Sequence, residues 1–219
     1  MLGAVEVETA PNPTRSIIWL HGLGADGHDF EPAVPYLHAP GGLALRFVFP
    51  HAPVRPVTLN GGLPMRAWYD IGALNAQAPQ DEAGIRAADA SIRALIAREN
   101  ERGIATERIV LAGFSQGGAM ALYTATRLPE KLAGVVGLSC YSLLAASFAA
   151  ERTAANQHTP IFLGHGTQDP VVIAELGAAA RAQLTAAGYN VEWHSYPMAH
   201  SVCAEELAHI ATFLQRVLQ

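Results

Sequence analysis

Short apolar runs alternate with amphipathic stretches along this chain, and the alternation predicts its architecture. Strand-like runs occupy 16–20, 43–49, 109–112, 132–140, 161–164 and 191–196. Helix-like stretches, with apolar residues three or four positions apart, occupy 81–102, 171–187 and about 202–218, and helix formers also follow Ser115 towards Pro129. Strands separated by helices favour a mostly parallel sheet covered on both faces. Because no internal repeat or linker-like tract interrupts the pattern, we expect residues 1–219 to form one α/β domain.

Three other stretches give weaker signals. Asp29 or its neighbour is expected to cap a short helix that reaches Leu37, with Pro32 near its first turn. Residues 50–75 are expected to be irregular, and a loop of that length is uncommon unless it is functional or disordered. Its aromatic residues argue against disorder. The alanine-rich stretch 141–159 predicts only a loop with a helical turn.

Composition narrows the classes of function. Half of the 219 residues are hydrophobic and 15% are charged, which suits one large core with a modest charged surface. The formal charge of −5, without any lysine or arginine block, argues against nucleic acid as a partner. No run approaches the ~18 apolar residues of a membrane span, and the first residues lack a signal-peptide pattern. We therefore expect a cytoplasmic monomer or homodimer with no stable membrane insertion. Cys140 and Cys203 are expected to be free thiols.

The stretch Gly113-Phe114-Ser115-Gln116-Gly117 lies between a strand-like run and helix-forming residues. In that context the pattern Gly-x-Ser-x-Gly is typical of a nucleophile elbow. A serine between strand and helix takes a strained backbone, which is tolerable only where small neighbours avoid clashes. N–H groups at the start of the following helix would face the space above the serine and stabilise an anion there. Ser115 is therefore the candidate nucleophile.

A serine nucleophile needs a base, and the base needs an orienting acceptor. Asp169 follows the strand-like run 161–164, and His200 follows the run 191–196. Taken alone, Asp169 is explained equally well as an Asp-Pro turn or helix cap, and a single loop histidine is usually just solvated. The order of nucleophile, acid and histidine, each beyond the carboxyl end of a strand, favours a triad of Ser115, Asp169 and His200.

The tetrahedral intermediate of acyl transfer also needs oxyanion donors. The backbone N–H of Gln116, directly after the nucleophile, is one candidate. The second is the N–H of Leu23, in the glycine-rich loop 21–28 that follows an early strand. His21 and His165, each followed by glycine after a strand, are interpreted as loop-stabilising residues.

Cofactor and metal sites are weighed against this interpretation. The loop 21–28 spells Gly22-x-Gly24-x-x-Gly27, a dinucleotide fingerprint, but the acidic residue expected about 20 positions later is missing. One Glu206-x-x-His209 pair on a helix is not a metal site, and the histidines form no other ligand pattern. We therefore expect no cofactor and no metal.

Several motifs occur together and in order along most of the chain. They are His21-Gly22-Leu23-Gly24, Phe49-Pro50-His51-Ala52-Pro53, Pro56-Val57-Thr58, Asn60-Gly61, Trp68-Tyr69-Asp70, Gly113-Phe114-Ser115-Gln116-Gly117-Gly118, His165-Gly166, Asp169 and Met198-Ala199-His200. On these motifs the sequence resembles the phospholipase/carboxylesterase family, which includes acyl-protein thioesterases and bacterial carboxylesterases. The resemblance implies an α/β-hydrolase fold without a large cap domain, and the same triad and oxyanion residues.

The resemblance also implies where the substrate binds. In that family the loop corresponding to 53–74 lies beside the active site and helps to shape the acyl channel. This places Leu63, Met65, Trp68 and Leu74 as an expected apolar wall, with simple packing under the loop as the alternative for Trp68. The substrate is expected to be a small-molecule or lipid-like ester or thioester, or an acylated protein.

Three functions follow as hypotheses. The first is a serine hydrolase that cleaves carboxylic esters or thioesters with short to medium acyl chains. The second places a lysophospholipase or a protein depalmitoylating thioesterase on the same site. A non-catalytic binding module with the hydrolase fold is the third, and it is disfavoured because such a module need not retain all three triad residues.

Overall fold

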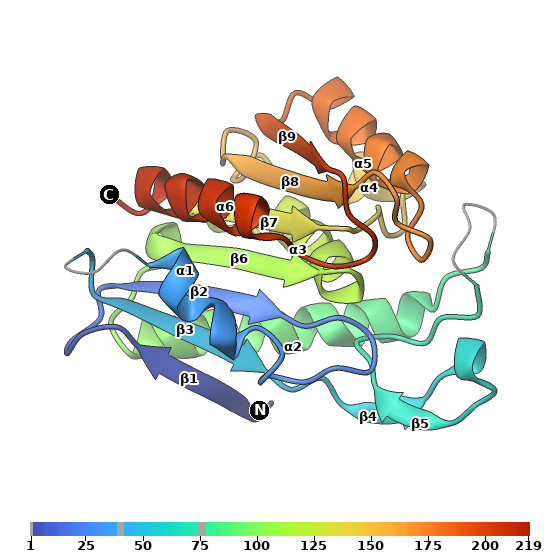
Figure 1. Cartoon of the computed structure of the whole chain (residues 1–219), viewed down its shortest axis with the longest axis horizontal. Coiled ribbons are helices and arrows are strands. Elements are labelled where there is room, and N and C mark those ends of the chain that lie inside the picture. Colours follow the sequence, from blue (N-terminus) through green and yellow to red (C-terminus); the bar gives the residue numbers. More distant parts are fainter. Residues whose placement is uncertain (1, 39–41, 74–77) are drawn as a thin grey trace.

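A seven-stranded sheet forms the centre of the computed structural model, which describes residues 2–38, 42–73 and 78–219 (Figure 1). Its strands are β1 (Ala4–Glu8), β2 (Arg15–Leu20), β3 (Leu45–Pro50), β6 (Ile109–Phe114), β7 (Gly134–Leu138), β8 (Ile161–Gly166) and β9 (Val191–Tyr196). They lie in the order β1-β3-β2-β6-β7-β8-β9. β1 pairs with β3 in antiparallel fashion, and the other neighbours pair in parallel. The carboxyl ends of the parallel strands therefore meet at one edge of the sheet.

Helices cover both faces of this sheet, as the alternation of patterns predicts (Figure 1). They are α1 (Val34–Leu37), α2 (Glu82–Glu101), α3 (Gln116–Arg127), α4 (Phe148–Glu151), α5 (Ala174–Ala186) and α6 (Ala204–Val217). Residues of α1 and α6 share one buried cluster with the sheet, whereas residues of α2, α3 and α5 belong to the cluster on the other face. None of the helices in the described part of the chain is both long enough and apolar enough to span a bilayer.

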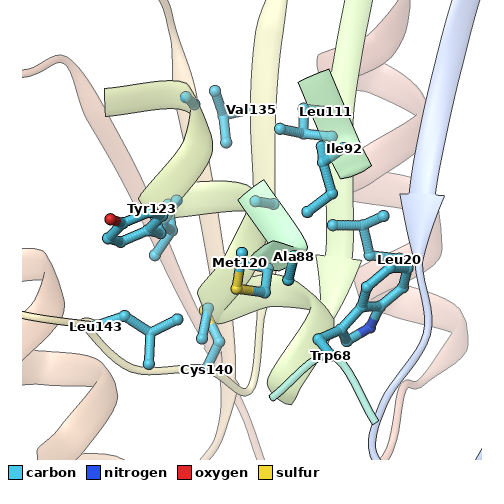
Figure 2. Packing of buried hydrophobic residues seen from close by; sticks show 14 of the residues in the cluster. Leu20, Trp68, Ala88, Ile92, Leu111, Met120, Tyr123, Val135, Cys140 and Leu143 are labelled. Carbon is cyan, nitrogen blue, oxygen red and sulfur yellow. The ribbon is translucent and has the colours of Figure 1, made fainter. Parts of the chain in front are cut away.

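The core is built from strands that are apolar on both faces. Ile17 and Ile18, adjacent in β2, are both fully buried, and they belong to the two different clusters because successive side chains of a strand point to opposite faces. Figure 2 shows part of the cluster beneath α2 and α3, where Ile92 and Met120 pack among residues of several strands. The strands are thereby fixed in position, and with them the loops at their carboxyl ends.

Two features of the fold were not expected from the sequence. β1 precedes the first expected strand, and its alternation of apolar residues with glutamate is that of an edge strand with one solvated face. The stretch 50–75, expected to be irregular, contains a two-stranded hairpin of β4 (Val54–Pro56) and β5 (Pro64–Arg66). Its strands have three residues each and include prolines, so they carry no strand pattern that the sequence could reveal.

Some helix boundaries differ from the expected ones. The short helix begins as a 3-10 turn at Glu31–Ala33, and its N-cap is Phe30, the neighbour of Asp29, without a side-chain capping bond. α5 begins at Ala174 rather than at residue 171, because the N–H groups of Val171 and Val172 donate to the Asp169 side chain instead of starting the helix.

Candidate active site

Ser115 occupies a sharp turn between β6 and α3, at the carboxyl edge of the sheet. Its backbone lies at φ 54° and ψ −119°, a region that costs on the order of 1–3 kcal/mol for a residue with a side chain. The turn is held by the Ser115 N–H, which donates to Leu138 O at 2.8 Å. A Cβ on Gly113 would overlap the backbone of Gly117, and one on Gly117 would overlap the carbonyl oxygens of Leu20 and His21. The glycines of the elbow are thus required by close backbone approach.

His200 and Asp169 converge on this serine from two other loops. The His200 Nε2 atom lies 2.9 Å from Ser115 Oγ, and its Nδ1 atom lies 2.7 Å from Asp169 Oδ2. Because a carboxylate only accepts hydrogen bonds, Nδ1 carries the hydrogen, and Nε2 is left to accept the proton of the serine hydroxyl. The Asp169 side chain is fully buried and that of His200 is largely buried. The three residues thus form one continuous hydrogen-bonded chain, in the arrangement that the sequence predicts.

The loop after β8 fixes the orientation of Asp169. Its Oδ1 accepts hydrogen bonds from the N–H groups of Val171 and Val172 at 2.8 and 2.9 Å, which leaves Oδ2 for the imidazole. His165 Nε2 donates to Val172 O at 2.8 Å and lies 3.7 Å from Asp169 Oδ2. His165 thereby supports the loop that carries Asp169. On the other side, the ring of Phe114 packs against the His200 ring at a centroid distance of 4.7 Å.

A cavity of about 230 Å³ opens beside Ser115. Its lining residues include Ser115 and His200 together with Leu23 and Gln116, the two expected oxyanion residues. Gln116 is the first residue of α3, where a backbone N–H has no acceptor within its own helix. The structure therefore brings the candidate nucleophile, the candidate base and both expected donors to one space.

His21 braces the loop that carries Leu23. Its Nδ1 donates to Gly22 O at 2.6 Å, and its Nε2 accepts from the Ala52 N–H at 3.0 Å. Burial lowers the pKa of the His21 imidazole, which keeps the ring neutral and therefore able to donate at one nitrogen and accept at the other. The expected loop-stabilising role of His21 is consistent with these contacts.

The apolar wall expected from the loop 53–74 is built differently. Trp68 is 1% exposed and lies in the core, where its indole N–H donates to His21 O at 2.9 Å (Figure 2). Leu63 is 62% exposed at the hairpin, and Met65 packs towards Gly24 rather than lining the cavity beside Ser115. Leu74 lies outside the described residues. Trp68 is held inside because an indole N–H needs an acceptor when buried, and the turn of β2 into its loop supplies one.

Other residues take the expected place of that wall. Leu59, Ile71, Tyr141 and Val171 line the cavity beside Ser115, and Ile71 and Tyr141 also line a second cavity of about 320 Å³. The sequence offers no periodic signal for them because they lie in loops or, for Leu59, in a single 3-10 turn. The Gln116 side chain is a further residue that the sequence does not reveal. It accepts from the Trp68 N–H at 2.8 Å and donates to Tyr69 O at 3.0 Å, so the elbow holds the segment leading to Ile71.

Residues 2–38, 42–73 and 78–219 contain no group of three or more histidine, cysteine, aspartate or glutamate side chains placed to hold a metal ion. The chemistry that this arrangement offers is that of a hydrogen-bonded serine next to backbone N–H donors, which is the chemistry of acyl transfer.

The sequence profile of the phospholipase/carboxylesterase family matches residues 3–218, nearly the whole chain. Acyl-protein thioesterase 1 of Neurospora crassa is 44% identical over 210 residues, which cover 92% of this chain and 86% of that protein. Acyl-protein thioesterase 1 of Gibberella zeae is 38% identical over 218 residues, covering 95% of this chain and 93% of that protein.

Two plant crystal structures are similar to the whole arrangement. Arabidopsis thaliana SOBER1 superposes with a TM-score of 0.88 at 32% identity, covering 94% of this chain and 99% of that chain. Zea mays acyl-protein thioesterase 2 superposes with a TM-score of 0.87 at 30% identity, and each chain is covered completely. The fold is therefore that of the α/β-hydrolases, and the described part of the chain carries no large cap domain.

Proposed function

The chain belongs to the phospholipase/carboxylesterase family and is a serine hydrolase, and from this premise we propose that Ser115, Asp169 and His200 cleave esters or thioesters with short to medium acyl chains. The observation that carries the proposal is the unbroken chain of hydrogen bonds from the Asp169 carboxylate through the His200 imidazole to the Ser115 hydroxyl. We also propose that residues 1–219 form one domain, which the single seven-stranded sheet supports.

The reaction divides into two steps of the same kind. Ser115 Oγ attacks the carbonyl carbon while His200 Nε2 takes the hydroxyl proton, and Asp169 stabilises the imidazolium through Nδ1. The negative charge on the carbonyl oxygen is held by the N–H groups of Leu23 and Gln116. When the tetrahedral intermediate collapses, the alcohol or thiol leaves with the proton from His200, and the acyl group remains on Ser115.

Water then completes the turnover. It takes the place of the departed alcohol or thiol, gives a proton to His200 Nε2 and attacks the acyl carbonyl. Collapse of this second intermediate returns the proton to Ser115 Oγ and releases the carboxylic acid. One oxyanion hole serves ester and thioester alike, because the carbonyl oxygen takes the same charge in both. No cofactor enters either step.

The proposal also covers where the acyl chain binds and which class of substrate carries it. The acyl arm extends from the cavity beside Ser115, past Ile71 and Tyr141, into the second cavity of about 320 Å³. The two curated relatives are both named acyl-protein thioesterases, which supports an acylated protein as one substrate class. A lysophospholipid on the same site is the second candidate, because it presents the same acyl ester to Ser115.

The test is hydrolysis of p-nitrophenyl esters from acetate to palmitate by the wild type and by Ser115→Ala. We expect a maximum at short or middle chain lengths, and a fall in turnover of at least about 10⁴-fold in Ser115→Ala, because the acyl-enzyme forms on the Ser115 hydroxyl. A circular-dichroism melt of both proteins controls for folding. Hydrolysis that persists in a folded Ser115→Ala protein would contradict the proposal.

A further inference from the structure

Two tyrosine hydroxyls meet in the wall between the two cavities. Tyr69 OH lies 2.7 Å from Tyr141 OH, although the two residues come from loops 72 positions apart in the sequence. Both residues are buried, at 2% and 9% exposure. Tyr141 lines the cavity beside Ser115 as well as the second cavity, and Tyr69 lines the second. Because Tyr141 lines both cavities, a chain that passes from Ser115 into the second cavity runs along this residue.

One of the two hydroxyl hydrogens of the pair has no acceptor in the described part of the chain. Each hydroxyl has one hydrogen, and a single bond between them uses only one of the two hydrogens. Burial raises the pKa of Tyr141 to about 12 and that of Tyr69 well above its usual range, so both hydroxyls keep their hydrogens at any working pH. Among the described residues, no third side chain or carbonyl accepts from either hydroxyl. A buried donor without an acceptor is unfavourable, and a ligand that supplies one relieves that cost.

The second cavity is suited to a chain that is apolar with an occasional polar group. Ile71, Leu143 and Leu176 supply apolar surface, whereas Gln80 and Gln183 bring amide groups to the same space. The Gln80 Oε1 atom accepts from the Leu144 N–H at 2.7 Å, which fixes that side chain by its oxygen. The lining is mostly apolar, so the acyl arm is the part of the substrate that the cavity fits.

On the basis of the proposed function, we propose that Tyr69 and Tyr141 select acyl chains that carry an oxygen acceptor (an ether, hydroxyl or ketone oxygen) at the point where the chain passes between the two cavities. Such an oxygen accepts the spare hydrogen of the pair. A chain with a methylene group at that point leaves the hydrogen unpaired and is discriminated against, as happens in sites built to bond a substrate group that an analogue lacks. No group of the pair takes part in the bond-breaking steps, so the two tyrosines are specificity-determining residues.

The test replaces one methylene group of p-nitrophenyl octanoate by an ether oxygen, at the fifth, sixth or seventh atom of the chain. These positions are remote enough from the carbonyl group to leave its reactivity unchanged, and the leaving group is constant. The measured quantity is the ratio of kcat/KM for the oxygen-containing ester to that for octanoate. In the wild type we expect a ratio of about 3 to 10 at one oxygen position, which corresponds to one neutral hydrogen bond.

The decisive variant is Tyr69→Phe combined with Tyr141→Phe, because either tyrosine alone would still offer a free hydrogen. Replacing both partners keeps the shape of the wall and removes both hydroxyls. We expect the ratio to fall below one in this variant, since the ether oxygen is then buried without a donor. Tyr36→Phe, at a tyrosine that is 67% exposed, is the matched control and should keep the wild-type ratio. A circular-dichroism melt like that of the wild type shows that the double variant is folded.

Two outcomes would overturn the inference. A wild-type ratio of one at every oxygen position would show that the tyrosine pair does not distinguish an oxygen from a methylene group in the acyl chain. A preference for the oxygen-containing ester that survives in the double variant would show that other residues cause this preference. In both cases Ser115-dependent hydrolysis of octanoate would leave the proposed function standing. Absence of any Ser115-dependent hydrolysis would instead contradict the proposed function itself, and the inference with it.

Discussion

At the scale of single residues, Glu206 places an acidic group in a fully buried position. It lies in the first turn of α6, six positions after His200, and is fully buried against Gly164 of β8, which leaves no room for a Cβ on that glycine. Neither of its carboxyl oxygens has a hydrogen-bond partner among the described residues. Burial raises the pKa of Glu206 from 4.5 to about 8. The carboxyl group is therefore protonated in the folded protein at neutral pH.

This gives a prediction about stability and pH. Between pH 4.5 and 8 the folded state keeps the Glu206 proton and the unfolded state releases it, so the free energy of unfolding falls as pH rises. The loss between pH 5.5 and 7.5 should be about 3 kcal/mol. Glu206→Gln should remove most of that slope, whereas Glu205→Gln, at the exposed neighbour, should keep it. Urea unfolding followed by tryptophan fluorescence at both pH values measures the difference, and equal slopes in all three proteins would contradict the prediction.

The catalytic candidates were predictable at this scale and the cavity walls were not. Ser115, Asp169 and His200 stand out because chemistry demands those residue types in that order beyond strand ends. The position of Trp68 depends on which acceptor its indole N–H finds, and that acceptor, His21 O, is 47 residues away in the sequence. Tyr141 gave no signal for the same reason, because its partner Tyr69 is defined only by the folded chain.

At the scale of elements, the elbow depends on how closely β2, β6 and α3 approach one another. A Cβ on Gly117 would overlap the carbonyl oxygens of Leu20 and His21, which belong to the end of β2 and the start of the loop bearing Leu23. Backbone atoms of a central strand cannot retreat as a flexible side chain would. The glycine therefore joins the packing of α3 on the sheet to the geometry of the oxyanion loop.

Gly117→Ala should accordingly lower both stability and activity. We expect a loss of about 2–4 kcal/mol in the free energy of unfolding, and a lower kcat from displacement of the Leu23 N–H. Gly3→Ala is the matched control, because a Cβ there meets nothing nearer than His51 Cδ2 at 3.7 Å, and it should change stability by less than about 0.5 kcal/mol. Thermal melts measure the stability of both variants, and p-nitrophenyl acetate hydrolysis measures their kcat. A Gly117→Ala protein as stable as Gly3→Ala would refute the packing argument.

Long elements were predictable and short ones were not. The pattern over 81–102 matches α2, with Asp81 at its N-cap, because twenty residues give helical periodicity enough turns to be seen. The three-residue strands β4 and β5 give no such repeat. α5 begins later than predicted because the Asp169 carboxylate accepts from N–H groups that would otherwise start the helix. The hydrogen bonds of Asp169 therefore outweigh the helix propensity of residues 171–173.

At the scale of the whole molecule, a charged network ties α2 to the edge of the sheet far from Ser115. Glu99 of α2 is fully buried, and its carboxylate lies 3.0 Å from Arg46 of β3 and 2.9 Å from Arg102. Arg46 also pairs with Glu8 of β1 at 2.9 Å, and Arg102 pairs with Glu6 at 2.9 Å. These ion pairs join one helix to β3 and to the antiparallel strand β1. They lie against the opening residues of β3, at the end of that strand away from the catalytic edge.

Because this network lies away from Ser115, its loss should lower stability without changing catalysis. Glu99→Ala leaves the buried guanidinium of Arg46 with Glu8 as its remaining partner, and breaking a buried pair in this way costs about 3–5 kcal/mol. We expect a much lower melting temperature with kcat/KM unchanged at 20 °C, because Ser115 and His200 keep their contacts while the protein is folded. Glu101→Ala, at an exposed glutamate two positions along the same helix, should leave the melting temperature within about 2 °C of the wild type. A Glu99→Ala protein that melts normally would show that the Glu99 carboxylate contributes little to holding α2 against β3. One that melts early and also loses activity while folded would show that the edge of the sheet is coupled to the site.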